Sequence, residues 1–221
     1  SQTLVYLDDD VDVPTDWLGR LGAAMQRLPE AGVWGCKVAD HAAPRLLQNV
    51  AGMLMVPPDA PPEAPKGTDI DWQGLSPNPF RLLDAHLYGP DWGLFDHISP
   101  CSSVTGCCHA FRRSWLDAAQ KDGGGFSLML MPSQYDDFER DLRMLDGGAY
   151  AAYTGHLRVR HRKRSGIESQ KDEAGAGAAG NRYKMQCMHD RASIARHIDG
   201  QDRRAQEHVA AALALLDATG E

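Results

Sequence analysis

Short apolar runs alternate along the chain with amphipathic segments, and this order predicts an α/β domain. Residues 4–7 form an apolar strand, and residues 17–28 place apolar side chains at the three- and four-residue spacing of a helix. Residues 33–38 predict a second strand, and residues 46–55 predict one or two more. Alternating strands and helices are typical of a sheet with helices packed against it.

The second half of the chain continues this pattern. Residues 102–113 predict a buried strand that ends in two arginines, and residues 114–119 predict a short helix. A further helix is expected at residues 136–145, followed by strand-like segments at 150–153 and 157–159. We therefore expect a mixed α/β sheet flanked by helices.

Composition divides the chain into three parts. Residues 1–165 form the predicted α/β portion, with a proline-rich irregular surface loop at residues 57–79. Residues 166–180 are rich in Gly and Ala and predict a flexible linker, and residues 181–221 predict a helical tail.

Charge and cysteine usage narrow the class of protein. The formal net charge is −7, which argues against a nucleic-acid partner, and the short basic cluster at residues 158–164 suits one anionic ligand. The five cysteines include no C-x-x-C pair, which favours reduced thiols in the cytoplasm and argues against a zinc site. No apolar run reaches the roughly 18 residues of a membrane span.

The run Asp8, Asp9 and Asp10 directly follows the first predicted strand. In an extended chain Asp8 and Asp10 point to the same side, so the two carboxylates could share Mg²⁺ or Mn²⁺. The alternative is a polar strand end that caps the following helix. An EF-hand is poorly supported, because its turn glycine would fall at Val13 and its closing glutamate at Gly19.

Two later segments carry further candidate chemistry. Asp136 and Asp137 begin a predicted helix, where the helix dipole alone favours carboxylates, but either could serve as a general base. His156 and His161 border a predicted strand, and an imidazole there could join the same metal or simply be a polar strand residue.

In this order the segments resemble the family 2 glycosyltransferases, which have the GT-A fold. The similarity covers about residues 4–165 and is carried by several motifs together. The family's D-x-D strand and the helix that follows it resemble residues 7–18, and its next strand and hairpin resemble residues 33–38 and 47–52. Its "tGa-x-x-x-fRR" element resembles residues 105–113. Its "F…ED-x-D-x-x-x-R" helix resembles Phe126 with residues 136–143, and its "v-x-H" motif resembles residues 159–161.

The resemblance implies a role for each matching residue. Asp8 and Asp10 would bind a Mn²⁺ or Mg²⁺ ion that bridges the donor diphosphate, with His161 as a further ligand, and Asp137 would deprotonate the acceptor hydroxyl in an inverting displacement. The implied donor- and acceptor-binding residues are Asp9, Gly106, His109, Arg112, Arg113 and Asp136. The two arginines could instead hold neighbouring carboxylates.

The implied activity is the transfer of one sugar from a nucleotide-diphosphate sugar to a saccharide or lipid-linked acceptor, since the Q-x-x-R-W motif of processive members is absent. The implied location is the bacterial cytoplasm, including the inner face of the membrane. Asp136 stands where the family has Glu. The family's N-terminal nucleotide-binding half has no counterpart here. We therefore expect an exposed strand edge, which favours self-association. The alternative function is an inactive acceptor-binding or assembly module that requires a separate nucleotide-binding half.

A phosphohydrolase of the haloacid dehalogenase type is a third hypothesis. Its nucleophile motif is also an apolar strand followed by D-x-D, and it has a later pair of aspartates. The residue two positions after the second aspartate should be Thr or Val, but in this chain it is Asp12.

Overall fold

The computed structural model describes residues 2–55, 81–84, 89–93, 96–121, 136–162, 181, 184, 188–189 and 191–219. The predicted loop at 57–79, the predicted linker at 166–180 and the matching residue Phe126 lie outside these residues. The strands are β1 (Thr3–Leu7), β2 (Val11–Asp12), β3 (Ala31–Asp40), β4 (Leu46–Asn49), β5 (Gly52–Met55), β6 (Arg81–Asp84), β7 (Gly89–Pro90), β8 (Ile98–Cys101), β9 (Cys108–Arg112) and β10 (Tyr150–His161). The helices are α1 (Trp17–Arg27), α2 (Arg113–Lys121), α3 (Asp136–Asp146) and α5 (Arg191–Thr219).

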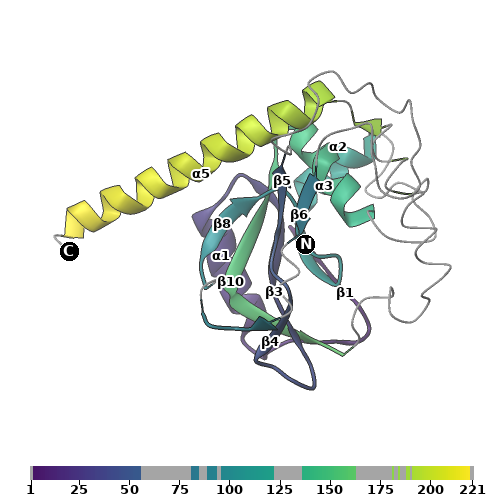
Figure 1. Ribbon diagram of the computed structural model, residues 1–221, viewed down its shortest axis with the longest axis vertical. Coiled ribbons are helices and arrows are strands. Elements are labelled where there is room, and N and C mark those ends of the chain that lie inside the picture. The colour runs from purple at the N-terminus through teal and green to yellow at the C-terminus, as the bar shows by residue number, and fades with distance from the viewer. Residues whose placement is uncertain are drawn as a thin grey trace.

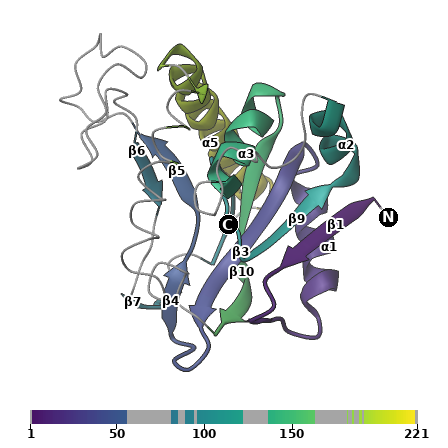
Figure 2. The same ribbon diagram turned by 90° about the vertical axis from the view of Figure 1, so that its right-hand side faces the viewer.

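A mixed sheet forms the centre of the molecule, with the strand order β1-β9-β3-β10-β2 (Figures 1 and 2). Strands β3 and β10 run parallel in the middle, whereas β9 is antiparallel to β3, and β1 is antiparallel to β9. On its other side, β10 pairs first with β8 and then, at its end, with β2. The predicted mixed α/β sheet with flanking helices and a C-terminal helix is confirmed.

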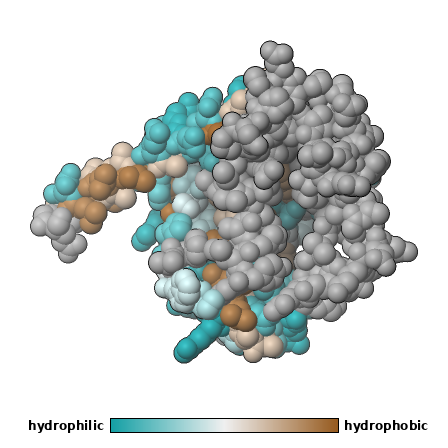
Figure 3. Space-filling view, viewed as in Figure 1, coloured by the Kyte–Doolittle hydropathy of each residue, from teal (hydrophilic) through white to brown (hydrophobic). Residues whose placement is uncertain are grey.

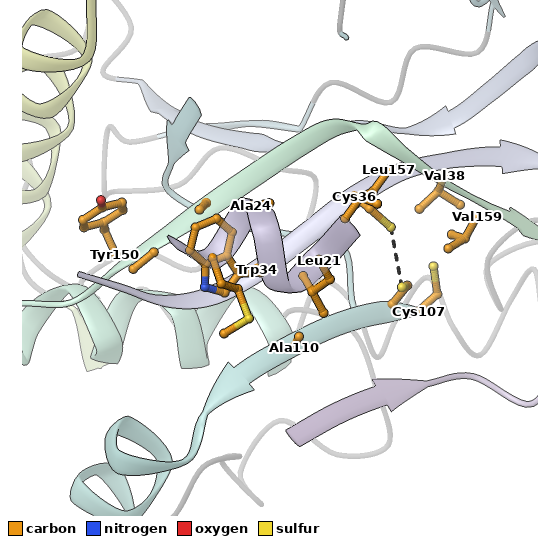
Figure 4. Close-up of a cluster of buried hydrophobic side chains, with 14 of the residues drawn as sticks. Leu21, Ala24, Trp34, Cys36, Val38, Cys107, Ala110, Tyr150, Leu157 and Val159 are labelled. Carbon is orange, nitrogen blue, oxygen red and sulfur yellow. Dashed lines mark hydrogen bonds between the residues drawn. The ribbon is translucent and has the colours of Figure 1, made fainter. Parts of the chain in front are cut away.

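Strand β3 is buried on both faces, because it lies in the middle of the sheet and its nearly continuous apolar run supplies buried side chains to both sides. Trp34, Cys36 and Val38 pack in one cluster with the apolar face of α1, including Leu21 (Figure 4). Val33 belongs to a second cluster with Phe111 of β9 and Met144 of α3. Strand β10 belongs to the same packed core as β3 and α1. This packing holds both strands in place, so their ends can present polar residues in defined positions.

Two predicted boundaries are wrong. The strand predicted at residues 102–113 begins only at Cys108, because the backbone of Ser102 and Ser103 bonds to Gly52 and the Val104 amide donates to the Asp141 side chain. The strands predicted at 150–153 and 157–159 are one strand, β10, with an irregularity in its pairing between Thr154 and Arg158.

Helix α5 begins against the body of the protein and ends away from it (Figure 1). Ile194 is part of the core with α1 and β3. The C-terminal half of α5 projects beyond the sheet, and Val209, Leu213 and Leu216 on it are exposed (Figures 1 and 3). Among the described helices, α5 included, none is long and apolar enough to cross a membrane.

Candidate functional site

The acidic run lies in a turn that connects β1 to β2. The Asp8 amide donates to the Cys107 carbonyl at 3.0 Å, and the Val11 amide donates to the Asp8 carbonyl at 3.3 Å. Asp8 and Asp10 were expected to share one side of an extended chain, but the strand ends at Leu7 and the turn, not strand alternation, orients them.

Pairing of β2 with the end of β10 brings this turn to His161. Val11 is opposite His161 in the antiparallel pair, and the Arg162 amide donates to the Asp10 carbonyl at 3.0 Å. The ligand atoms offered by Asp8, Asp10 and His161 all lie within 4.8 Å of one another. Asp10 and His161, which lie far apart in the sequence, thus belong to one cluster at the edge of the sheet.

The cluster concentrates negative charge. Partial burial raises the pKa of Asp8, and the carboxylates of Asp10, Asp9 and Asp136 raise it further, while His161 lowers it. The Nε2 atom of His161 lies 3.1 Å from Oδ1 of Asp10. Two carboxylates and an imidazole within this distance fit a hard divalent cation such as Mn²⁺ or Mg²⁺, which Asp8, Asp10 and His161 would hold.

The Gln48 side chain holds His161 at the ring nitrogen that faces away from Asp10. Its Nδ1 atom lies 3.0 Å from Oε1 of Gln48 in β4, and Nε2 of Gln48 donates to Oδ2 of Asp40 at 3.2 Å. The Gln48 and His161 side chains are both buried. Sequence reasoning assigned no role to Gln48 or Asp40, because their contacts arise only when β3, β4 and β10 come together.

Asp137 lies at the N-terminus of α3 against the turn that precedes β9. A Cβ atom at Gly106 would lie 3.0 Å from Oδ2 of Asp137, so the missing side chain of Gly106 makes room for this carboxylate. Burial, followed by the charges of Asp141 and Asp136, raises the pKa of Asp137 to about 6, although Arg140 opposes the shift. A carboxylate with this pKa suits proton transfer near neutral pH.

The Gly106–Cys107 turn connects Asp137 to the acidic cluster. Gly106 contacts Asp137, and the next carbonyl, that of Cys107, accepts the Asp8 amide. Burial raises the pKa of the Cys107 thiol, and the charges of Asp8 and Asp137 both add to that shift. The metal-ligand candidates and the general-base candidate therefore share one edge of the sheet.

The other predicted site residues occupy varied positions. Asp9 is exposed in the turn, and Asp136 is half-buried beside Asp137. His109 is buried under the Tyr6 ring, at a centroid distance of 5.3 Å, and its Nε2 lies 3.4 Å from Arg140. His156, which was considered as a ligand, is exposed and lies outside the cluster.

The two arginines lie at the opposite end of β9 from the acidic cluster. Arg112 is opposite Thr3 in the β1–β9 pair, whereas Cys108 is opposite Leu7, so about 13 Å of strand separates Arg112 from the acidic end. Arg112 donates to the backbone carbonyls of Met25 and Ala31. Arg113 pairs on the surface with Asp117 at 3.1 Å, so both guanidinium groups contact structural partners.

A buried network of charges in α3 supports the Asp137 side of the site. Arg140 and Asp141 are fully buried and form an ion pair at 2.7 Å. The other Asp141 oxygen accepts the Val104 amide at 2.9 Å, which anchors the loop that leads to Gly106. Glu139 pairs with Arg143 at 2.8 Å. This network holds the start of α3, and with it Asp137, against the sheet.

Comparison with known proteins finds distant structural likeness but no match in sequence. No protein-family model matches the chain, and no curated protein matches its sequence. Among solved structures, the crystal structure of GalNAc-T7 with UDP, GalNAc and Mn²⁺ is similar with a TM-score of 0.44 and 15% sequence identity. The match covers 91% of this chain and 38% of that chain. The chain therefore spans well under half the length of that protein.

Proposed function

We propose that this chain is the metal-binding and acceptor-side portion of a glycosyltransferase of the family 2 type. It would transfer one sugar from a nucleotide-diphosphate sugar to a hydroxyl of a saccharide or lipid-linked acceptor, with inversion. The observation that carries this proposal is the convergence of Asp8, Asp10 and His161 with Asp137 across the Gly106–Cys107 turn.

The geometry supports separate roles for the Asp8–Asp10–His161 cluster and for Asp137. Asp8, Asp10 and His161 would hold Mn²⁺ or Mg²⁺. The bound ion would offset the negative charge on the leaving diphosphate. Asp137 would accept the proton of the acceptor hydroxyl, since its raised pKa leaves it ionised at neutral pH yet basic enough to take a proton.

The proposal assigns the remaining predicted residues by their position. Asp9 and Asp136 border the acidic cluster and are available to the donor or the acceptor. His109 would support the site indirectly, through its contacts with Arg140 and the Tyr6 ring. For Arg112 and Arg113, their contacts favour structural roles at the far end of β9.

Activity is tested by supplying Mn²⁺, a panel of nucleotide-diphosphate sugars and simple saccharide acceptors, and measuring release of the nucleoside diphosphate together with the glycosylated product. We expect product only with the metal present, and loss of product in Asp8→Asn. Asp117→Asn, which changes an exposed surface carboxylate, is the matched control and should keep the wild-type rate. Metal-independent transfer would refute the proposed site.

A second candidate function is an inactive acceptor-binding or assembly module that needs a separate nucleotide-binding half or a second copy. Strand β1 favours it, because among the described strands β1 pairs only with β9, and Tyr6 and Leu7 on it are exposed. Calorimetric titration with a nucleoside diphosphate and Mn²⁺ separates the two functions. Binding by this chain alone supports the transferase, whereas Mn²⁺ binding without nucleotide binding supports the module.

A further inference from the structure

The hydrogen bonds around Gln48 define which end of its amide faces His161. On one side, Nε2 of Gln48 lies 3.2 Å from Oδ2 of Asp40 and 3.3 Å from the backbone carbonyl of His161, and both of these atoms are acceptors. On the other side, Oε1 lies 3.0 Å from Nδ1 of His161. Turning the amide over would place its oxygen against two acceptors, so the oxygen must face the imidazole ring.

This orientation dictates the proton arrangement on the imidazole. Because Oε1 only accepts, Nδ1 of His161 must carry the hydrogen of that bond. The opposite nitrogen, Nε2, faces the Asp10 carboxylate at 3.1 Å, and a carboxylate is also an acceptor. A neutral imidazole bound in this way directs its Nε2 lone pair into the acidic cluster, so a cation there could bind this nitrogen together with the Asp10 carboxylate.

We propose that Gln48 is a positioning residue of the metal centre. Its amide oxygen holds the Nδ1 hydrogen of His161 and so keeps Nε2 as the metal-binding atom. This inference rests on the proposed metal site, because it assigns a role to a residue that would not touch the cation.

Asp40 fixes Gln48 in turn. Oδ1 of Asp40 accepts the backbone amides of Ala42 at 2.8 Å and Ala43 at 2.9 Å, so the carboxylate is locked in the turn between β3 and β4. The remaining oxygen, Oδ2, is then directed at the Gln48 amide. The chain of contacts from the β3–β4 turn through Gln48 to His161 sets the imidazole before any ligand arrives.

The first test replaces Gln48 by Met, which has a similar volume but lacks the amide. Loss of an outer partner of a ligating histidine typically weakens metal binding by about 10- to 100-fold. We therefore expect Gln48→Met to weaken Mn²⁺ binding by about that factor in calorimetry. Pulsed electron paramagnetic resonance of the bound Mn²⁺ should show the imidazole nitrogen in the wild type and show it weakened in Gln48→Met.

A compensating pair of substitutions separates positioning from packing. Gln48→Glu keeps the acceptor for Nδ1 but sets a carboxylate against Asp40 and against the backbone carbonyl of His161. Adding Asp40→Asn supplies an amide that donates to the new carboxylate, while its oxygen still accepts the Ala42 and Ala43 amides. We expect the double variant to regain part of the affinity and the nitrogen signal that Gln48→Glu alone loses, since Asp40→Asn relieves one of the two unfavourable contacts of the new carboxylate.

The outcomes distinguish this inference from the proposed function. Wild-type protein that binds no Mn²⁺, or binds it without a nitrogen signal, contradicts the proposed metal site itself. Wild-type protein with the signal, but with equal affinity and signal in Gln48→Met, overturns the role of Gln48 alone. If Gln48→Met does not fold, the comparison of Gln48→Glu with and without Asp40→Asn decides, and a double variant no better than the single one overturns the inference.

Discussion

Helix α3 carries carboxylates in two environments within two turns. Near its middle, Asp141 is fully buried and paired with Arg140, and Glu139 is fully buried and paired with Arg143. At its first turn, Asp137 adjoins Gly106, and the charge of the neighbouring Asp136 adds to the effect of burial in raising the pKa of Asp8 in the acidic cluster. The paired charges are fixed by hydrogen bonds to the surrounding protein, whereas the acids at the helix start adjoin other acids.

The contrast shows how the same residue type builds structure in one place and a site in another. Buried ions need partners, and Arg140 supplies one to Asp141. In the acidic cluster, partial burial raises the pKa of Asp8 and neighbouring carboxylates raise it further, and a raised pKa in such a cluster is characteristic of binding and catalytic sites. A cation from solution would do for Asp8 and Asp10 what Arg140 does for Asp141.

The largest expected effect comes from removing the proposed base. Asp137→Asn should lower the transfer rate by about 100- to 10,000-fold, because a positioned general base contributes that much. Mn²⁺ affinity should stay close to that of the wild type, since Asp137 is not in the ligand cluster. The wild-type rate should rise with pH and level off above about 6, as Asp137 loses its proton. Transfer that survives the substitution removes Asp137 from this role.

Breaking the buried ion pair of α3 should lower the stability of the fold. Arg140→Met leaves Asp141 buried without its cation and should lower the free energy of unfolding by about 3–5 kcal/mol. The matched control is Arg20→Met, which breaks an exposed pair with Asp16 and should cost at most about 1 kcal/mol. Urea denaturation measures both. Equal losses in the two variants would remove the distinction between buried and surface pairs.

The Asp137 side chain should also destabilise the fold above its pKa. Its pKa is raised from 3.8 to about 6 by folding, so the folded state holds a proton that the unfolded state releases, and stability falls as pH rises from about 4 to 6. Asp137→Asn removes this penalty. At pH 8 without metal it should be more stable than the wild type by up to about 3 kcal/mol, with the gain lost below pH 4. Urea denaturation at the two pH values measures it, and a gain that does not depend on pH would contradict the burial of this charge.

A smaller effect is expected at Gly106. Gly106→Ala places a methyl group 3.0 Å from Oδ2 of Asp137 and should displace the carboxylate, lowering the transfer rate by about 10- to 100-fold. Stability should change by only about 1 kcal/mol, because a side-chain end can move. In the control Gly22→Ala, nothing lies within 4 Å of the new Cβ, so α1 should gain about 0.5–1 kcal/mol with an unchanged rate. An unchanged rate in Gly106→Ala would show that this contact does not position Asp137.

The spacing of apolar residues was sufficient to predict the helices and strands that have a clear hydrophobic periodicity. The apolar spacing of α1 and the β3 run gave their positions within a few residues, and α3 began where its acidic first turn was expected. Strand β8 was not predicted, because Ile98–Cys101 is short and contains Pro100, which fits only at a sheet edge.

The site was only partly predictable for a physical reason. Asp8 and Asp10 could be proposed from chemistry that is visible in the sequence, whereas Asp137 and His161 were singled out by the resemblance to family 2 glycosyltransferases. The contact between Gly106 and Asp137, and the bonds from Gln48, depend on elements far apart in the chain and on the register of the sheet. Residue type alone gives no signal for such contacts.

Mn²⁺ binding to the purified chain tests the central claim most directly. Calorimetry should show one ion bound to the wild type and binding weakened beyond detection in Asp10→Asn, while the surface control Asp117→Asn binds like the wild type. Loss of the ion in Asp10→Asn but not in Asp117→Asn would support a metal centre at the acidic turn that follows β1. Wild-type protein that binds no Mn²⁺, or Asp10→Asn that binds it equally well, would contradict the account.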